Sequence, residues 1–491
     1  MKRYLLDLAN ISQKTLSSIE KSNLDDTEFF VSPIQYKLSQ NLTNLPIRFA
    51  PMPTFPVSYR EEDILKKTAE AIGAHLVSSK IPNAFTEEKM LQSLAEKDPV
   101  PFCNLAKEYS NLRTEIESNL LKVLSHGRFI GGDEIHLLEQ KAQEYCNVPY
   151  AIACSSGTDA LLLLLMALGI QKGDVVITTP FTFIATAETI ALVGAKPLFV
   201  DIDETSYNIS PQKLKEALRL AAAKNHPKIE EGEKVKAIIA VDLYGQPADY
   251  EEIQQAIKEY ESSTGKKIAL IEDAAQAFGA QYKGKRAGSL APYAATSFFP
   301  AKPLGTYGDA GMVFTTDEQV AKQVRQLLNH GQSKRYVHSK IGLNARMDTM
   351  QAAILLAKFE PYCETYLKNR KQIANEYKKQ LERISDFVLP EIKEGNDSAW
   401  AQFTIRARNV KQRNHITEEL QKRGIPTAIH YPKPLHLQEC FAYLGYQKGD
   451  LPVAEKVADH VFSLPMDSVK TQEEIAYIAQ NLIEIVKTKS I

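Results

Sequence analysis

From about residue 101 onward, short apolar runs alternate along the chain with longer stretches in which apolar residues recur every three or four positions. Apolar runs bounded by turn residues predict buried strands, whereas the longer recurrence predicts amphipathic helices. The predicted strands lie at residues 150–153, 174–178, 196–200, 235–241, 268–271, 297–299 and 311–314. The predicted helices lie at residues 106–125, 160–168, 185–193, 211–222 and 250–260. This alternation predicts right-handed crossovers and a mostly parallel α/β sheet.

Toward the C-terminus the alternation gives way to a long helical pattern and then to a mixture of helix and strand. The predicted elements there are helices at 351–383, 415–423 and 473–486 and a strand at 401–406. We therefore expect a large α/β domain over residues 101–350 and a smaller C-terminal α+β domain over residues 351–491. A turn at Gly131-Gly132-Asp133 is expected to open a helix, with Asp133 as its N-cap.

Residues 1–100 differ from the rest. They mix weak helical patterns at 14–21 and 61–75 with a proline-rich stretch around residues 46–56, and they carry no recognisable chemical motif. We expect a separate N-terminal extension here. It could be an extra domain, a fusion remnant, an oligomerisation arm or a shield over part of a site, and a purely structural role is the simplest reading.

Composition narrows the class of partner. The chain has 491 residues, of which 44% are hydrophobic and 24% are charged, as in an ordinary globular protein of two or three domains. The formal net charge of −1 gives no overall attraction to nucleic acid or to an anionic membrane, so we expect neither partner. Any phosphate must therefore be held by a local site.

Cysteine usage bears on the compartment. The five cysteines are widely spaced and form no CxxC pair, which argues against a disulfide framework and against a zinc site, so no metal is expected. The start of the chain lacks the apolar stretch and cleavage site of a secretory signal. The longest apolar run, at 160–170, is too short to span a bilayer. We expect free thiols in a reducing cytoplasm.

Three motifs carry candidate chemistry. Ser155-Ser156-Gly157-Thr158 follows a predicted strand and opens an apolar helix, so its backbone N–H groups could cradle a phosphate, although an ordinary capped turn would look the same. Asp273 ends a predicted strand, where ligands of open α/β sheets bind, or it merely caps a loop. Lys302 lies between aromatic, proline and glycine residues, where desolvation would help its amine to form a Schiff base, whereas most lysines are simply solvated.

The order of these motifs gives them more weight than any of them has alone. The stretch from about residue 101 to the C-terminus resembles the DegT/DnrJ/EryC1/StrS sugar aminotransferases, which are fold-type I pyridoxal-phosphate enzymes. The matching segments, in chain order, are FIGGDEIHLLE, SSGTDALLL, PFTFIATAE, VDLYGQPAD, EDAAQAFGA, TSFFPAKPLGTYGDAG, GLNARMDTMQAAIL, HYPKPLH and SLPM. The resemblance implies pyridoxal 5'-phosphate as the cofactor.

The resemblance also implies roles for the matching residues of the cofactor site. Lys302 matches the family's Schiff-base lysine; dehydratases of the family carry His there, so lysine favours transamination. Asp273 matches the carboxylate that pairs with the pyridine nitrogen and keeps the ring an electron sink. Phe183 matches the aromatic residue that stacks on the ring, and Gln276 a group near the ring hydroxyl. The matches to phosphate contacts are Gly157, Thr158, Ser297 and, from the neighbouring subunit, Asn344. This last match implies a homodimer with shared sites.

The implied reaction has two halves with ping-pong kinetics. An amino donor, usually glutamate in this family, displaces Lys302, whose amine then moves a proton as general base and acid; the keto-sugar then runs the same steps backwards. The alternative of another class is a non-catalytic binding or regulatory protein of this fold. Because Lys302 and Asp273 are both present, the sequence favours the enzyme.

The segment from His330 to Arg346 resembles the branch that aminates carbon 3 of UDP-2-acetamido-3-keto-hexuronic acids in surface-polysaccharide biosynthesis. In that branch the arginine matching Arg346 reaches across the dimer to the sugar carboxylate, which a bidentate guanidinium suits. His338, His430 and Tyr431 are the other predicted substrate contacts. The alternative for Arg346 is an ion pair with Asp348 or a helix end. The alternative substrate is a dTDP-linked 3-keto-6-deoxyhexose.

Overall fold

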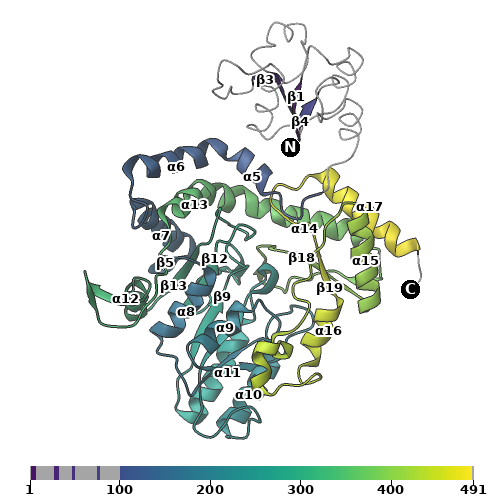
Figure 1. Ribbon diagram of the computed structural model, residues 1–491. Helices are drawn as coiled ribbons and strands as arrows, with labels where there is room; N and C mark the ends of the chain where they lie inside the picture. Colours follow the sequence, from purple (N-terminus) through teal and green to yellow (C-terminus); the bar gives the residue numbers. More distant parts are fainter. Residues whose placement is uncertain (1, 7–26, 32–46, 50–74, 78–99, 489–491) are drawn as a thin grey trace. The chain divides into compact units, whose positions relative to one another are not determined.

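The computed structural model describes residues 2–6, 27–31, 47–49, 75–77 and 100–488. The chain forms two compact units, Met1–Asp98 and Pro99–Ile491 (Figure 1). In the first unit the described strands are β1 (Lys2–Leu6), β2 (Thr27–Val31), β3 (Ile47–Phe49) and β4 (His75–Val77). They pair in parallel in the order β3-β2-β1-β4. The helical pattern expected at 14–21 and the four prolines around 46–56 lie outside the described residues, as does the pattern at 61–75 apart from His75.

A seven-stranded sheet forms the centre of the second unit, in the order β5-β13-β12-β9-β8-β6-β7. The strands are β5 (Tyr150–Cys154), β6 (Asp174–Thr178), β7 (Lys196–Phe199), β8 (Lys234–Val241), β9 (Ala269–Asp273), β12 (Tyr293–Ser297) and β13 (Gly311–Thr315). Strand β13 runs antiparallel to its two neighbours, and the other pairs are parallel. The predicted α/β fold with a mostly parallel sheet is therefore confirmed.

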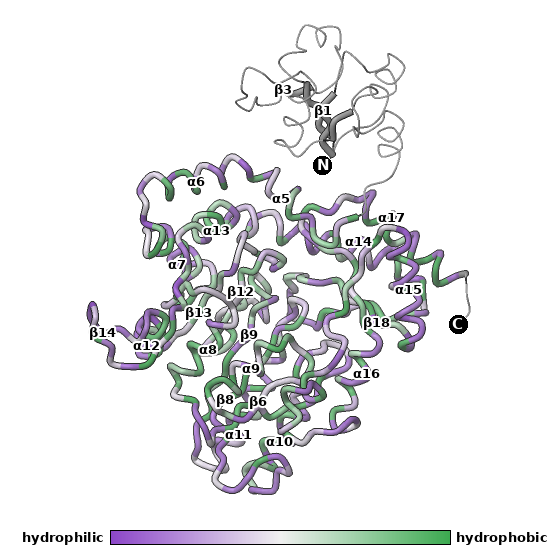
Figure 2. Tube along the Cα trace, in the orientation of Figure 1, coloured by the Kyte–Doolittle hydropathy of each residue, from purple (hydrophilic) through white to green (hydrophobic). Residues whose placement is uncertain are grey.

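Helices cover both faces of this sheet. They include α7 (Asp133–Cys146), α8 (Gly157–Ala167), α9 (Ala185–Leu192), α10 (Pro211–Ala222), α11 (Tyr250–Thr264) and α12 (Glu318–Leu327). Alternate residues of a strand point to opposite faces. Accordingly Val175 and Ile177 pack with α10 and α11, whereas Val176 packs with α8 and α12. Figure 2 shows the apolar positions along β6 and β8.

The C-terminal part adds a small antiparallel sheet, β16-β18-β19. Its elements are α13 (Thr349–Pro361), α14 (Leu367–Leu381), β16 (Phe387–Val388), β18 (Phe403–Ala407), α15 (Val410–Lys422), α16 (Pro452–His460), β19 (Val461–Leu464) and α17 (Gln472–Thr488). Helices α14, α15 and α17 share one apolar core with β18 and β19. Among the described residues, no helix is long and apolar enough to cross a membrane.

Four local predictions were wrong in detail. The helix expected at 106–125 is two helices, α5 (Leu105–Asn111) and α6 (Arg113–His126), and the one expected at 351–383 is divided by a π-helical turn, Tyr362–Tyr366. The strand expected at 297–299 lies earlier, because Phe298 is buried in the core beneath a turn rather than paired in the sheet. Gly132, not Asp133, is the N-cap of α7.

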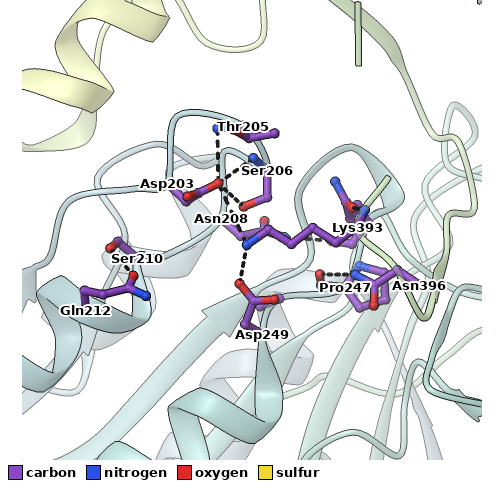
Figure 3. A network of polar contacts seen from close by, with 12 residues as sticks. Asp203, Thr205, Ser206, Asn208, Ser210, Gln212, Pro247, Asp249, Lys393 and Asn396 are labelled. Atoms are coloured by element: carbon purple, nitrogen blue, oxygen red, sulfur yellow. Dashed lines mark hydrogen bonds and ion pairs between the residues drawn. The ribbon is translucent and has the colours of Figure 1, made fainter. Parts of the chain in front are cut away.

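A polar network ties the segment before β17 (Asn396–Asp397) to the large sheet (Figure 3). The Lys393 ammonium lies 2.6 Å from Oδ2 of Asp249, and the Lys393 backbone N–H donates to Oε1 of Gln246 across 2.8 Å. Asn208 accepts from the Leu243 N–H and donates to the Gln246 carbonyl. These bonds fix the short helix η2 (Leu243–Gly245), which lies beside the cavity described below.

Candidate active site

A cavity of about 470 Å³ opens at the carboxyl ends of the parallel strands. This is where open α/β sheets bind their ligands. Nine of the twelve residues that the sequence predicted for the site line this one cavity: Gly157, Thr158, Phe183, Asp273, Gln276, Ser297, Lys302, His430 and Tyr431. The wall therefore combines residues from the large sheet with two from the C-terminal part.

One end of the cavity is suited to a phosphate. Helix α8 begins at Gly157, and its N-cap Ser156 accepts a hydrogen bond from the Asp159 N–H at 3.0 Å. A Cβ atom at Gly157 would lie 2.7 Å from Cβ of Ser297, so glycine is needed for this close approach. Gly157, Thr158 and Ser297 all line the cavity, and the free N–H groups at the start of a helix suit an anion.

Asp273 ends β9 with its carboxylate buried in the cavity wall. Its Oδ2 accepts from the Thr186 hydroxyl at 2.8 Å, and its Oδ1 accepts from the Ala275 N–H at 3.2 Å. Burial raises the pKa of Asp273, while these two hydrogen bonds and the positive charge of Lys302 act in the opposite direction. A buried carboxylate with donors of this kind can hold a protonated ring nitrogen.

Lys302 lies in a tight turn that follows β12. Its N–H donates to the Phe299 carbonyl at 2.6 Å, and the Thr306 N–H donates to the Phe298 carbonyl at 2.8 Å. Burial lowers the pKa of Lys302, and Asp273 opposes this shift. An amine that loses its proton more easily is a better nucleophile toward a carbonyl carbon.

The opposite wall is aromatic and polar. Phe183 keeps 54% of its surface exposed although it lines the cavity, so its ring offers a flat face for stacking. Gln276 accepts from the Tyr244 N–H at 2.6 Å and donates to the Tyr431 hydroxyl at 3.2 Å. Burial lowers the pKa of His430 to about 4, and Lys302 adds to this effect, so the imidazole is neutral near pH 7.

Three predicted site residues lie outside this chain's cavity. His338 is exposed on the hairpin formed by β14 (Gln332–Lys334) and β15 (Val337–His338), and its Nδ1 lies 2.9 Å from the His330 carbonyl. Asn344 is exposed just beyond. Arg346 donates to Oδ1 of Asn329, and its buried Nε has no partner within the part of the chain that the structure describes. The alternative ion pair between Arg346 and Asp348 is not formed.

Other residues of the site escaped the sequence prediction. Thr186 follows Phe183 by one helical turn on the same segment, and this spacing could have pointed to it. Asp309 also lines the cavity, and it makes no hydrogen bond or ion pair among the described residues. Tyr244 lies in the matching segment VDLYGQPAD, but no role is predicted for it from the sequence.

The residues present fit pyridoxal phosphate. The corner at Gly157 and Ser297 suits its phosphate, Asp273 suits its pyridine nitrogen, and the open face of Phe183 suits its ring. Lys302 stands in the same cavity with an amine whose pKa is lowered.

Comparison with known proteins agrees with this geometry. The model of the DegT/DnrJ/EryC1/StrS aminotransferase family matches residues 110–483. UDP-2-acetamido-2-deoxy-3-oxo-D-glucuronate aminotransferase of Pseudomonas aeruginosa is 43% identical over 75% of this chain and 95% of its own. A dTDP-3-amino-3,4,6-trideoxy-alpha-D-glucose transaminase of Streptomyces venezuelae is 35% identical over 77% of this chain and 93% of its own.

Among solved structures, NtdA from Bacillus subtilis with bound cofactor PMP superposes with a TM-score of 0.70 at 26% identity. The superposition covers 92% of this chain and 97% of NtdA. The match of fold, cavity and family together has one conclusion: the chain belongs to the DegT/DnrJ/EryC1/StrS aminotransferase family and is a pyridoxal-phosphate-dependent aminotransferase.

Proposed function

We propose that the protein transfers an amino group from L-glutamate to carbon 3 of a UDP-2-acetamido-3-keto-hexuronic acid, for surface-polysaccharide biosynthesis. The observation that carries this proposal is that the Arg346 side chain forms no ion pair with any residue that the structure describes. Its guanidinium bonds the neutral Asn329 and has no carboxylate partner among the described residues. A planar cation that lacks an anion is suited to bind the carboxylate of a hexuronate in a bidentate manner. The 43% identity to the Pseudomonas aeruginosa enzyme supports the same substrate class.

The cofactor is held by residues already grouped in the cavity. Gly157, Thr158 and Ser297 bind the phosphate, and Asp273 keeps a proton on the pyridine nitrogen. When bound, pyridoxal phosphate supplies an aldehyde carbon and an electron-withdrawing ring that weakens the bonds to the attached amine's carbon. Gln276 and Phe183 would orient the cofactor's ring, Gln276 by a hydrogen bond near its hydroxyl and Phe183 by stacking.

Lys302 performs two tasks in this account. Its Nζ would hold the cofactor until the amino donor arrives and would then be released as a free amine. The freed Nζ takes a proton from the donor carbon and returns it on the adjacent side, as general base and then general acid. The lowered pKa of Lys302 serves both tasks, because each begins with the uncharged amine, and the proton that Nζ takes up as a base is the one that it later donates as an acid. The keto-sugar is aminated by the same steps in reverse.

We further propose that the enzyme is a homodimer whose sites are completed across the interface. His338, Asn344 and Arg346 lie outside their own chain's cavity, which leaves them available to a partner's. Apolar side chains are exposed on α6, α7 and the segment between them: Leu121, Leu124, Phe129, Ile130 and Leu137. Such a set of exposed apolar residues suits coverage by a second copy. The five free cysteines suit the cytoplasm as the compartment.

The second candidate substrate is a dTDP-linked 3-keto-6-deoxyhexose. The 35% identity to the Streptomyces venezuelae transaminase favours it, but such a sugar has no carboxylate for Arg346. A non-catalytic role is disfavoured because Lys302 and Asp273 line the same cavity.

A direct assay distinguishes between the two candidate substrates. The purified protein, saturated with cofactor, is given glutamate and a panel of UDP- and dTDP-linked 3-keto-sugars, and 2-oxoglutarate is measured. We expect turnover with the UDP-linked hexuronate. Turnover confined to the 6-deoxy sugars would overturn the assignment of Arg346, and an absence of turnover with every sugar would overturn the proposed function itself.

A further inference from the structure

His430 is held from two sides by buried hydroxyl groups whose residues do not themselves line the cavity. The Tyr244 hydroxyl donates to the His430 carbonyl, and the Ser463 hydroxyl lies 3.3 Å from Nδ1 of the His430 ring. The other ring nitrogen, Nε2, makes no hydrogen bond within the described residues. The imidazole therefore has one nitrogen fixed by the protein and one left for a ligand.

The hydroxyl groups are linked to each other as well. The Thr404 and Ser463 hydroxyls lie 2.9 Å apart. Burial raises the pKa of Tyr244, and the Thr404 hydroxyl is near enough to the Tyr244 hydroxyl to oppose this larger effect. Tyr244, Thr404 and Ser463 are respectively 7%, 1% and 0% exposed, so no bulk water competes for these bonds. In such surroundings each hydroxyl depends on its neighbour for a partner, and the chain of bonds sets one arrangement.

The three hydroxyl groups come from distant parts of the fold. Thr404 and Ser463 are paired residues of β18 and β19 in the C-terminal sheet. Tyr244 belongs to η2, beside the central sheet, and has a left-handed backbone conformation with φ of 59°. Strained residues of this kind persist where the surrounding structure determines them, often at functional sites. The same residue donates its N–H to Gln276 at 2.6 Å, so Tyr244 holds two residues of the cavity lining, Gln276 through its backbone and His430 through its side chain.

We propose that Tyr244, Thr404 and Ser463 form a buried hydroxyl chain that positions His430 for the keto-sugar, and that these three are positioning residues of the amination half-reaction. This inference rests on the proposed function, because it takes His430 as a substrate contact. The hydroxyl chain fixes the carbonyl and the Nδ1 of His430 together, so the ring cannot turn without breaking a buried bond. Because the ring is neutral near pH 7, it binds by a directed hydrogen bond rather than by charge.

The test uses Tyr244→Phe and Ser463→Ala, with Tyr207→Phe as the matched control. Tyr207 is also buried, and its ring lies 5.7 Å from that of Tyr244, but it does not line the cavity. Each variant, saturated with cofactor, is followed by absorbance in two separate half-reactions. The first adds glutamate alone, and the second adds the keto-sugar to the aminated enzyme.

For Tyr244→Phe and Ser463→Ala we expect kcat/KM for the keto-sugar to fall about five- to tenfold, as for the loss of one buried hydrogen bond. The rate of the glutamate half-reaction and the intensity of the cofactor absorbance should each stay within about twofold of the wild-type value, because the Tyr244 N–H still holds Gln276. The double variant should cost less than the product of the two single effects, since both act through one ring.

Two results would overturn the inference. The first is that both variants behave like Tyr207→Phe toward the keto-sugar. The second is that the rates of the two half-reactions fall equally, which would indicate a general structural role. Failure of the proposed function is seen separately, because the wild-type enzyme would then aminate none of the keto-sugars.

Discussion

Thr186 donates its hydroxyl hydrogen to Oδ2 of Asp273 across 2.8 Å, and both residues are buried. The two residues lie 87 positions apart in the sequence. The bond favours the ionised form of a carboxylate whose pKa burial raises. Since the carboxylate must be ionised to hold the proton of the pyridine nitrogen, Thr186 supports the cofactor without touching its reacting carbon.

Replacing Thr186 by Val should therefore weaken cofactor binding. We expect the Kd for pyridoxal phosphate to rise about tenfold, as for a lost hydrogen bond to a charged group. Titration of the apo-protein, followed by absorbance, measures this change. Thr189→Val is the matched control, because its buried hydroxyl bonds only backbone carbonyls of its own helix. Equal affinities in the two variants would contradict a role for Thr186.

A second prediction concerns the lysine turn. Lys358 of α13 is 1% exposed; its ammonium lies 2.7 Å from the Glu108 carboxylate and donates to the Gly305 carbonyl, three residues after Lys302. Lys358→Met should cost about 3 kcal/mol in the free energy of unfolding, because it leaves a partly buried carboxylate without its cation. Urea denaturation measures the loss.

The control for this variant is Lys141→Met, which breaks the exposed ion pair with Glu360 on the same helix, α13. That change should cost less than about 1 kcal/mol. If Lys358→Met were no more destabilising than Lys141→Met, the buried pair would not hold the turn.

A third prediction concerns pH. Glu272 and Asp242 form a fully buried pair of carboxyl groups, close enough for each to influence the pKa of the other. Burial raises the pKa of Glu272 from its usual 4.5 to about 7, and burial together with the charge of Glu272 also raises the pKa of Asp242. Between pH 4.5 and 7 the folded protein therefore keeps a proton that the unfolded chain releases.

The sign of the effect follows from this difference. The stabilising contribution is complete below the unfolded pKa and is lost as the pH rises through the folded value, with a slope of at most about 1.4 kcal/mol per pH unit. Asp242→Asn keeps the bonds from Ala248 and Tyr250 and can donate to an ionised Glu272. The urea midpoint of the apo-protein should fall less between pH 5 and 8 in this variant than in wild type. A steeper fall would contradict the shared proton.

A fourth prediction separates substrate from cofactor. Arg346→Lys should lower kcat/KM for the hexuronate about 100-fold, since a lysine cannot form the bidentate pair. The Kd for the cofactor should be unchanged. Arg335→Lys, on the neighbouring exposed hairpin, is the control. An unchanged rate in Arg346→Lys would mean that its role is limited to the bond with Asn329.

Local patterns in the sequence predict much of this fold. The predicted strands are short apolar runs, and the helices that cover the sheet have apolar residues at every third or fourth position. The strand expected at 297–299 was wrong because Phe298 is apolar for another reason: it packs with Phe278 beneath the lysine turn. An apolar run indicates that its residues are buried, but it does not show whether they are buried in a strand of the sheet or beneath a turn. The prediction of one continuous helix at 351–383 was wrong for a similar reason. A π-helical turn interrupts the α-helix there, but it leaves the spacing of apolar residues almost unchanged.

The residues of the candidate site also fall into two groups, those that the sequence could reveal and those that it could not. Gly157, Asp273 and Lys302 could be found because each stands in a short motif of known chemistry. The role of Tyr244 and of the other hydroxyl groups around His430 could not, because their partners lie far away in the sequence and only the packed fold brings them together. Hydrogen bonds of this kind leave no periodic pattern in a single sequence.

The central claim is that Lys302 carries the cofactor opposite Asp273. Its most direct test is to saturate the protein with pyridoxal phosphate, reduce it with borohydride and locate the added mass by peptide mass spectrometry. We predict one modified peptide, labelled at Lys302, and no stable label in Lys302→Ala. A label on a different lysine, or none in the wild-type protein, would contradict the account.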